Sequence, residues 1–286
     1  MNPVLQIVEC PRDAMQGWAH FIPTDQKVAY LQQLLTCGFP ILDCGSFVSP
    51  KAIPQMRDTA EVLEALSLDG SDTKLLVIVA NTRGIEDAVQ HQKVHYLGFP
   101  LSVSETFQQR NTNKSIAQAL EEVQLLQERC EKHSKEAMVY LSMGFGNPYG
   151  DPYSPDAIVA QTGRLVAMGV RNIALADTVG VADGATITTL FEQLVPAFPE
   201  ARISAHFHAT PTDWKSKIEA AWAAGCTRFD GAIGGIGGCP MAKDELVGNL
   251  NTEHLLRWTR QQAIPTGIEE AAFEKAVQMA QRVFVG

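Results

Sequence analysis

The chain has 286 residues, of which 45% are hydrophobic and 19% are charged, and its formal net charge is -9. This composition supplies enough apolar surface for a full core and excludes a chain that is mostly disordered. The negative charge argues against binding of nucleic acid or an anionic membrane by the molecule as a whole, and leaves room only for a local basic pocket.

Membrane and disulfide signals are missing from the sequence. No apolar run approaches the roughly 20 residues of a membrane-spanning helix, and the first residues lack the basic and apolar segments of a secretory signal. The 6 cysteines are scattered, without a C-x-x-C pair, so neither a disulfide framework nor a zinc knuckle is indicated. We therefore expect a cytoplasmic protein with free thiols.

Short apolar runs alternate with longer amphipathic segments along the chain. The runs rich in Val, Ile, Leu and Phe predict buried parallel strands at residues 5–10, 41–44, 74–79, 94–101, 137–142, 172–176, 202–207 and 228–232. Helical spacing and capping residues predict helices at 24–36, 114–133, 154–168, 185–194, 212–224, 252–262 and 269–283. The helical signal after the third strand is weak.

This alternation predicts an α/β fold with a closed (β/α)8 TIM barrel. The alternative, a doubly wound open sheet, usually carries a glycine-rich loop after its first strand, and here that strand is followed by Pro11, Arg12 and Asp13. No linker or low-complexity segment divides the chain. We expect one catalytic domain over residues 1–286, with about 265–286 as a C-terminal helical extension.

Catalytic groups of such barrels lie at the carboxyl ends of the strands, and the first polar cluster there contains Arg12, Asp13 and Gln16. The arginine offers a planar fork of donors for a carboxylate or a developing oxyanion. The aspartate offers hard oxygen ligands. A surface Arg–Asp ion pair is an equally good interpretation of this cluster when it is taken alone.

His206 and His208 stand at the end of the seventh predicted strand. Residues two apart in a strand point to the same side, so both imidazoles can converge on one metal ion. A pair of ordinary polar residues at a strand end is the alternative. We favour a metal, because two histidines and a carboxylate with open positions suit a divalent cation that activates oxygen groups.

A glycine-rich segment, residues 234–240, follows the eighth predicted strand and precedes Asn249. So many glycines predict a mobile loop or a close approach to a ligand, or else a plain flexible connection. Cys239 stands at the tip of this loop, where a thiol can be presented to a ligand. The side-chain carbonyl of Asn249 is an acceptable ligand for Mg²⁺ or Mn²⁺.

Three other polar sites lie at or beyond the ends of predicted strands: Asp43 at the end of the second strand, Lys51 after it, and the pair Asp177-Thr178 after the sixth. Either aspartate can orient a ligand, a water on the metal, or Arg12, and a helix N-cap is an equally good role for Asp177. Lys51 can meet an anion, although most lysines are only solvated.

Together these motifs resemble hydroxymethylglutaryl-CoA lyase, a member of the metal-dependent barrel lyases and synthases. The resemblance runs in order over nearly the whole chain and rests on residues 7–13, 46–51, 177–180, 206–208, 237–240 and 248–249. Segment 46–51, Ser-Phe-Val-Ser-Pro-Lys, and loop 237–240, Gly-Gly-Cys-Pro, are specific to the lyase branch. The Arg-Asp and His-x-His elements are shared with the synthases.

The resemblance implies cleavage of 3-hydroxy-3-methylglutaryl-CoA, an acyl-CoA, to acetyl-CoA and acetoacetate, as in leucine degradation and ketone-body metabolism. It implies that a divalent metal, Mg²⁺ or Mn²⁺, is bound by Asp13, His206, His208 and Asn249. Arg12 then stabilises an enolate, Asp13 or His206 is the general base, and Cys239 protonates the enolate carbon. The residues left to bind or orient the substrate are Gln16, Asp43, Lys51, Asp177 and Thr178. A homodimer is also implied.

The chain departs from the family pattern at several points. Ala14-Met15 stands where Gly-Leu is usual, Asp43 falls where Glu is more common, and the stretch from Cys239 to Asn249 is one residue longer. The metal and the type of reaction survive these changes. Three alternatives stay open: a related barrel lyase acting on another 3-hydroxyacyl-CoA, a condensing 2-oxoacid acyltransferase of the isopropylmalate synthase type, and a catalytically silent barrel that only binds CoA esters or a partner protein.

Overall fold

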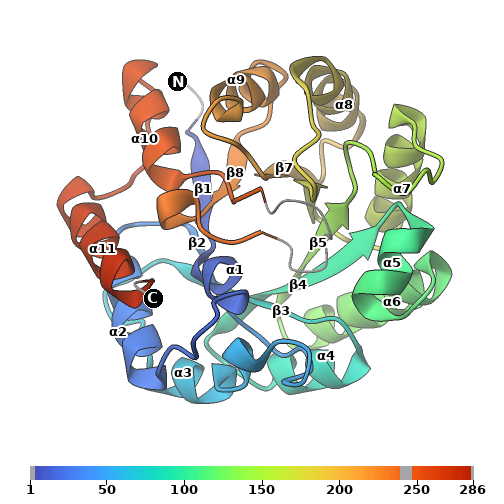
Figure 1. Ribbon diagram of the computed structural model, residues 1–286. Helices are drawn as coiled ribbons and strands as arrows, with labels where there is room; N and C mark the ends of the chain where they lie inside the picture. The colour runs from blue at the N-terminus through green and yellow to red at the C-terminus, as the bar shows by residue number, and fades with distance from the viewer. Residues whose placement is uncertain (1–3, 239–246, 285–286) are drawn as a thin grey trace.

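The computed structural model describes residues 4–238 and 247–284. Parallel strands close into a barrel in sequence order, and β8 pairs with β1 to complete it (Figure 1). The strands are β1 (Gln6–Glu9), β2 (Ile41–Ser46), β3 (Lys74–Ile78), β4 (Val94–Ser102), β5 (Glu136–Ser142), β6 (Asn172–Asp177), β7 (Arg202–Phe207) and β8 (Arg228–Gly231). The barrel confirms the predicted (β/α)8 fold and excludes the open doubly wound sheet.

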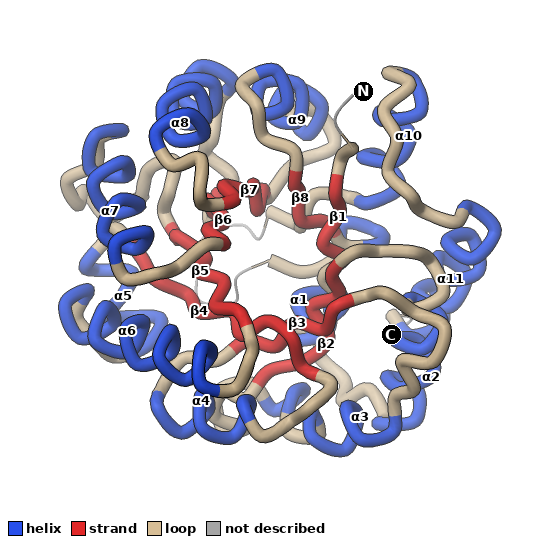
Figure 2. The backbone as a smooth tube through the Cα atoms, turned by 180° about the vertical axis from the view of Figure 1, so that it is seen from behind, coloured by secondary structure: helices blue, strands red, loops and turns tan. Residues whose placement is uncertain are grey.

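Most of the helices surround this ring of strands on its outside, as Figure 2 shows from behind, whereas α1 (Pro11–Gln16) lies at the mouth of the barrel. The others are α2 (Thr24–Leu34), α3 (Thr59–Ala65), α4 (Thr82–Val89), α5 (Glu105–Thr112), α6 (Ile116–Lys132), α7 (Pro155–Ala167), α8 (Gly184–Ala197), α9 (Trp214–Ala223), α10 (Thr252–Gln261) and α11 (Glu270–Val283). Two short 3-10 turns, η1 (Pro54–Met56) and η2 (Ile233–Gly235), lie in the loops after β2 and β8.

Side-chain caps explain where several helices begin. Ser115 opens α6 with a capping box, because it accepts from the backbone N–H of Gln118 while the Gln118 side chain accepts from the Ser115 N–H. Ser154 caps α7 ahead of Pro155, as the sequence predicts. The weak segment after β3 is a regular helix, α4, because the Asn81 side chain accepts from the N–H of Gly84.

The alternation of side chains along each strand separates two packed regions. In β5, Val139 and Leu141 belong to the apolar layer between barrel and helices, whereas Met138 and Tyr140 belong to a cluster that also includes Val8 and Leu76. Strand residues two apart face the same side. Inward-facing residues near the carboxyl end of each strand therefore become the floor of any site at that end of the barrel.

The C-terminal helix α11 packs against α2. Phe284 follows α11 and meets the rings of Trp18 and Tyr30 edge-on, at centroid distances of 5.4 and 6.1 Å. Among the described residues, no helix has the length and apolar character that crossing a membrane requires. The cysteines in this part of the chain are buried free thiols, as expected: Cys10, Cys37, Cys44, Cys130 and Cys226.

Candidate active site and metal centre

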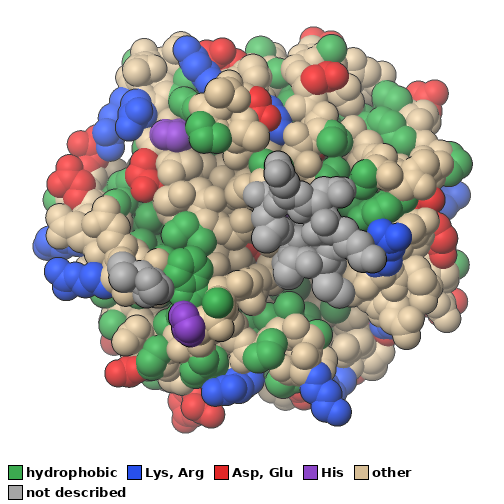
Figure 3. All heavy atoms as spheres, in the orientation of Figure 1, with side chains coloured by type: hydrophobic (Ala, Val, Ile, Leu, Met, Phe, Trp, Pro, Cys, Tyr) green, Lys and Arg blue, Asp and Glu red, His purple; other side chains and the backbone are tan. Residues whose placement is uncertain are grey.

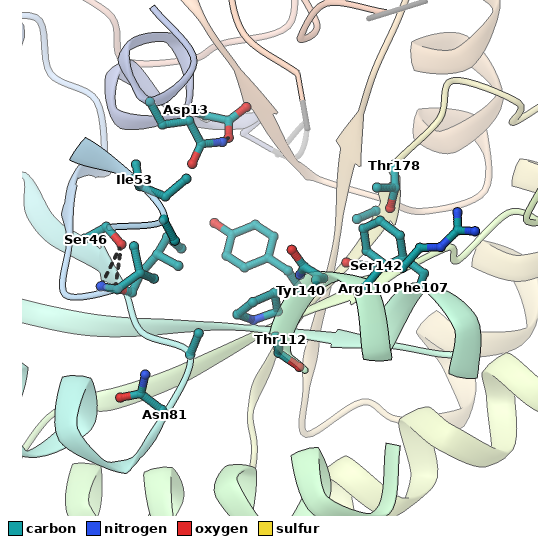
Figure 4. A pocket seen from close by; sticks show the side chains of 18 of the residues that line it. Asp13, Ser46, Ile53, Asn81, Phe107, Arg110, Thr112, Tyr140, Ser142 and Thr178 are labelled. Atoms are coloured by element: carbon teal, nitrogen blue, oxygen red, sulfur yellow. Dashed lines mark hydrogen bonds between the residues drawn. The ribbon is translucent and has the colours of Figure 1, made fainter. Parts of the chain in front are cut away.

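A cavity of about 480 Å³ opens at the carboxyl ends of the strands (Figure 4). Its lining includes Arg12, Asp13 and Gln16 from α1, and Tyr140, His206 and His208 from β5 and the end of β7. The sequence places these residues more than 190 positions apart from first to last. The barrel brings them together because all the strands point their carboxyl ends to the same face.

Arg12 is the centre of a buried network of charged hydrogen bonds. Its Nε donates to Asp43 at 2.9 Å and its Nη2 donates to the same carboxylate at 2.5 Å. Its Nη1 donates to Asp13 and to Gln16, both at 2.9 Å. Gln16 in turn donates to Asp13 at 2.6 Å. A bidentate pair of this kind fixes the plane of the guanidinium, which faces the cavity with a single orientation.

Three possible metal ligands meet beside this network. One donor atom each of Asp13, His206 and His208 can be chosen so that the atoms all lie within 4.8 Å of one another. Burial alone would raise the pKa of Asp13, but Arg12 and the two histidines outweigh it and lower that pKa to about 2. Burial, helped by the charge of His206, lowers the pKa of His208 to about 4. The carboxylate is therefore charged and His208 neutral, the forms that bind a cation.

Asp230, at the carboxyl end of β8, orients His206. Its Oδ2 lies 3.0 Å from Nδ1 of His206. Burial lowers the pKa of His206, but the hydrogen bond and the charge of Asp230 outweigh this and raise it overall. A carboxylate on one ring nitrogen leaves the other nitrogen for a metal and increases its basicity.

A second group of possible ligands, Cys10, His206 and Asp230, shares His206 with the first. Burial raises the pKa of the Cys10 thiol well above its usual range. Because the thiolate is the form that binds metals, this second group is the poorer candidate for a metal centre.

Asn249 reaches the site from the segment after the glycine-rich loop. Its Nδ2 donates to Asp13 Oδ2 at 2.6 Å and to the Ile236 carbonyl at 2.9 Å. Gly237 allows this approach, because a Cβ there would lie 2.5 Å from Asn249 Nδ2 and its φ is +106°. Cys239, the predicted acid, lies outside the described residues.

The remaining predicted residues are placed unequally. Thr178 lines the cavity, and its hydroxyl accepts from the N–H of Met143. Asp177 is buried and engaged elsewhere: it accepts from Lys217 at 2.8 Å and from the Ala182 N–H at 3.1 Å. Helix α8 is capped by Asp183 and not by Asp177. Lys51 is exposed, and the cavity lining near it consists of Ser49, Ala52 and Ile53.

Three residues of the site do not belong to the motifs recognised in the sequence: two line the cavity, and one orients His206. Tyr140 is buried, its hydroxyl has no hydrogen-bond partner among the described residues, and Figure 4 shows its ring in the middle of the pocket. Arg110, on α5, lines the same cavity, and its guanidinium lies 4.5 Å from the centre of the Tyr149 ring. The third is Asp230. Tyr140 could have been found from the alternation of its strand, because Met138, Tyr140 and Ser142 are two apart and therefore face the inside of the barrel together.

Comparisons with known proteins agree with this geometry. The HMGL-like family model matches residues 5–280. Hydroxymethylglutaryl-CoA lyase YngG of Bacillus subtilis is 32% identical over 259 residues, which cover 91% of this chain and 86% of that protein. A 3-hydroxy-3-isohexenylglutaryl-CoA/hydroxy-methylglutaryl-CoA lyase of Pseudomonas aeruginosa is 31% identical, with 94% and 88% covered.

A solved HMG-CoA lyase of Acinetobacter baumannii, in complex with coenzyme A and 3-methylmalate, superimposes with a TM-score of 0.91. It is 30% identical, and the match covers 98% of this chain and 91% of that one. The match of the family model over nearly the whole chain, and relatives of this identity and coverage, show that the chain belongs to the HMGL-like family.

Proposed function

We propose that this chain is a divalent-metal-dependent carbon–carbon lyase that cleaves 3-hydroxy-3-methylglutaryl-CoA to acetyl-CoA and acetoacetate. The observation that carries the proposal is the meeting of Asp13, His206 and His208 beside Arg12, in a cavity at the carboxyl ends of the strands. Relatives named as lyases of this substrate support it. The alternative of a lyase for another 3-hydroxyacyl-CoA draws on the second substrate in the name of the Pseudomonas relative.

The donor set fits a divalent ion that prefers oxygen and imidazole. One carboxylate, two imidazoles and the amide of Asn249 are the mixture that Mg²⁺, Mn²⁺ and similar ions accept, and we propose Asp13, His206, His208 and Asn249 as the ligands. Such an ion supplies Lewis acidity that lowers the pKa of a 3-hydroxyl group and holds it in place.

Cleavage requires the 3-hydroxyl to lose its proton while its oxygen becomes a carbonyl. The bond between C2 and C3 breaks, and its electron pair passes into the thioester to form the enolate of acetyl-CoA. Asp13 or His206 is the proposed base for this proton. Arg12 is the proposed donor to the enolate oxygen, because its guanidinium is already held in one orientation by Asp43. Cys239 is proposed to return a proton to C2, which completes acetyl-CoA.

Tyr140 adds a donor that the sequence motifs do not contain. Burial raises the pKa of its hydroxyl well above the usual range, so the group stays protonated. Within residues 4–238 and 247–284 its O–H has no partner, and the ring centre of His206 lies 5.5 Å from that of Tyr140, so the hydroxyl is suited to a substrate oxygen. We propose that Tyr140 binds the carboxylate or the thioester oxygen of the substrate, next to the reacting carbon.

The cavity also carries charges that suit coenzyme A. Arg110 and Lys114 line it together with the side chains of Asn81, Asn111 and Asn113. Lys114 is paired with Glu122 at 2.5 Å, whereas Arg110 has no acidic partner within 4.0 Å among the described residues. We propose Arg110 as the local cation that offsets the net charge of -9 for an anionic CoA ester.

The test is acetoacetate formation from hydroxymethylglutaryl-CoA by the purified protein, after EDTA treatment and after addition of Mg²⁺ or Mn²⁺. We expect turnover only with added metal, and no condensation when acetyl-CoA and 2-oxoacids are supplied instead. A panel of other 3-hydroxyacyl-CoA esters separates the related lyases. Binding of the ester without metal, and without turnover of any ester, would contradict the lyase proposal and support a catalytically silent barrel that only binds CoA esters.

The proposal also covers the oligomeric state of the enzyme, its compartment and its metabolic pathway. We propose a homodimer, which sedimentation or light scattering measures directly, and a cytoplasmic enzyme of leucine degradation or ketone-body metabolism. Growth on leucine, with and without the gene, tests the metabolic assignment.

A further inference from the structure

A second cavity, of about 710 Å³, lies at the opposite end of the barrel, where the strands begin. Figure 2 views the molecule from behind, with the ring of strands at its centre. The lining includes Gln6, Lys74, Arg202 and Arg228, which are the first residues of β1, β3, β7 and β8. Tyr96 from β4 lines it as well. The proposed lyase uses none of these residues.

Two guanidinium groups converge on one neutral atom in this cavity. Arg202 Nη1 donates to Gln6 Oε1 at 3.1 Å, and Arg228 Nε donates to the same oxygen at 3.3 Å. Arg228 also donates to Asn172 Oδ1 at 3.0 Å. Both arginine side chains donate to neutral amide oxygens, and Arg228 also lies close enough to the Tyr96 hydroxyl to oppose the rise in its pKa that burial causes. Two cations thus share neutral partners at short range.

Burial makes this arrangement costly in the absence of a counter-ion. Arg228 is only 2% exposed, and a buried charge is normally paired. Burial lowers the pKa of Arg228, and the neighbouring charge of Arg202 lowers it further. Glu136 joins this network only indirectly, because it accepts from Asn172 Nδ2 at 2.8 Å. The charge of Asp230 acts in the opposite direction on the pKa of Arg228, but that carboxylate contacts His206 at 3.0 Å and makes no ion pair with Arg228 among the described residues. Within this part of the chain, the two guanidinium groups therefore lack a direct carboxylate partner at the most enclosed point of the cavity.

The carboxylates of the same cavity come from other segments. Asp69 and Asp72 lie before β3, and Glu269 lies just before α11, whereas both arginines start neighbouring strands on the other side of β1. These acids disfavour a polyanion, which would have to fill the whole cavity. A small oxyanion at the two guanidinium groups avoids them and still satisfies the forked donors.

We propose that the amino-terminal mouth of the barrel binds a phosphate group, held by Arg202 and Arg228 and assisted by Lys74 and the Tyr96 hydroxyl. The ligand class is inorganic phosphate or a small phosphate monoester. Phosphate accepts bidentate hydrogen bonds from arginine, and a guanidinium that already donates through one edge to Gln6 or Asn172 keeps N–H groups for it. The site is separate from the proposed lyase centre.

The experiment measures inorganic phosphate binding to the full chain by calorimetry and by the shift of the melting temperature, with sodium chloride at matched ionic strength as reference. A second arm replaces inorganic phosphate with glycerol 3-phosphate, which shows whether the monoester is preferred. The variants are Arg202→Gln and Arg228→Gln. Arg202 is exposed, so its substitution should perturb the fold less than that of the buried Arg228. The matched control is Arg282→Gln, an exposed arginine on α11.

We expect saturable binding by the wild-type chain and by Arg282→Gln, and binding about tenfold weaker in Arg202→Gln, because a charge-assisted hydrogen bond is lost. If Arg228→Gln fails to fold, Arg202→Gln alone decides. Equal effects of phosphate and chloride would overturn the proposal, as would equal affinities of Arg202→Gln and Arg282→Gln. Weakening by Arg110→Gln in place of Arg202→Gln would put the anion in the lyase cavity and overturn it too. Lyase activity is not the readout, so failure of either proposal is recognised separately.

Discussion

The Asp230 carboxylate lies 3.0 Å from Nδ1 of His206, and this contact decides which ring nitrogen of the histidine is left for a metal ion. The pair joins the ends of two neighbouring strands, β7 and β8, which are hydrogen-bonded at Ala205 and Phe229. In the proposed metal centre, this contact would orient His206 before an ion binds, and the carboxylate would increase the basicity of the imidazole.

We expect Asp230→Asn to weaken Mn²⁺ binding by about 10- to 100-fold, because an amide neither fixes the ring nor increases its basicity as a carboxylate does. The dissociation constant is measured by electron paramagnetic resonance of free Mn²⁺. Asp25→Asn, at an exposed position on α2, is the control and should bind as the wild type does. Equal affinity of the two variants would show that Asp230 has no part in holding the ion.

The Arg12 fork gives a second expectation. Arg12→Lys keeps the charge but loses the bidentate contact with Asp43, so kcat should fall by about 10²- to 10³-fold with a smaller change in KM. Arg83→Lys, an exposed arginine of α4, serves as control. Melting temperatures are measured in parallel, because Asp43 is fully buried and a poor partner would also destabilise the fold. A near-normal kcat in a folded Arg12→Lys protein would remove the enolate role.

The barrel could be predicted from the sequence because eight apolar runs alternate with amphipathic segments, so the same strand–helix pattern recurs along the chain. The short helices could not be predicted in this way. Helix α1 has six residues and α5 has eight, too few for a 3.6-residue period to be recognised, and α5 is held by the Ser104 cap and by contacts of Asp151 with Ser104 and Thr106.

The predicted site was recognisable where the residue type carries its own chemistry, as with His206 and His208. Asp230 and Tyr140 were not, because an aspartate or a tyrosine in a strand is ordinary until the neighbour across the barrel is known. Asp177 shows the converse case. Its position at the end of a strand predicted that it orients a ligand or caps a helix. In the folded chain its carboxylate instead accepts a hydrogen bond from Lys217, which is itself 1% exposed.

Tyr140 gives a third expectation. Removing its hydroxyl in Tyr140→Phe should lower kcat/KM by about 10- to 100-fold, because the variant loses a hydrogen bond to a charged substrate group. The fold should be as stable as the wild type or more so, because the change removes a buried O–H that has no partner in the described part of the chain. Steady-state kinetics with denaturant unfolding measures both quantities. Tyr30→Phe, buried on α2 away from the cavity, is the control, and an identical kcat/KM for the two variants would contradict the role of Tyr140.

Glu9 gives a dependence of stability on pH. Its carboxyl is fully buried and accepts from the Ile233 N–H and the Thr252 hydroxyl. Burial outweighs these bonds and raises its pKa from 4.5 to about 8. The folded protein therefore keeps a proton that the unfolded chain releases above pH 4.5. The stability that this proton contributes is present at low pH and is lost as the pH rises through about 8.

Glu9→Gln removes this titration but keeps an acceptor for Ile233 and a polar group facing Thr252. Between about pH 5 and pH 8 the unfolding free energy of the wild type should fall, relative to that of Glu9→Gln, by up to about 1.4 kcal/mol per pH unit. Urea unfolding at three pH values within this window measures the difference. The control, Glu192→Gln on the exposed face of α8, should follow the wild type. Parallel pH profiles for Glu9→Gln and the wild type would mean that Glu9 is ionised in the folded protein, with the Ile233 and Thr252 hydrogen bonds strong enough to hold its charge.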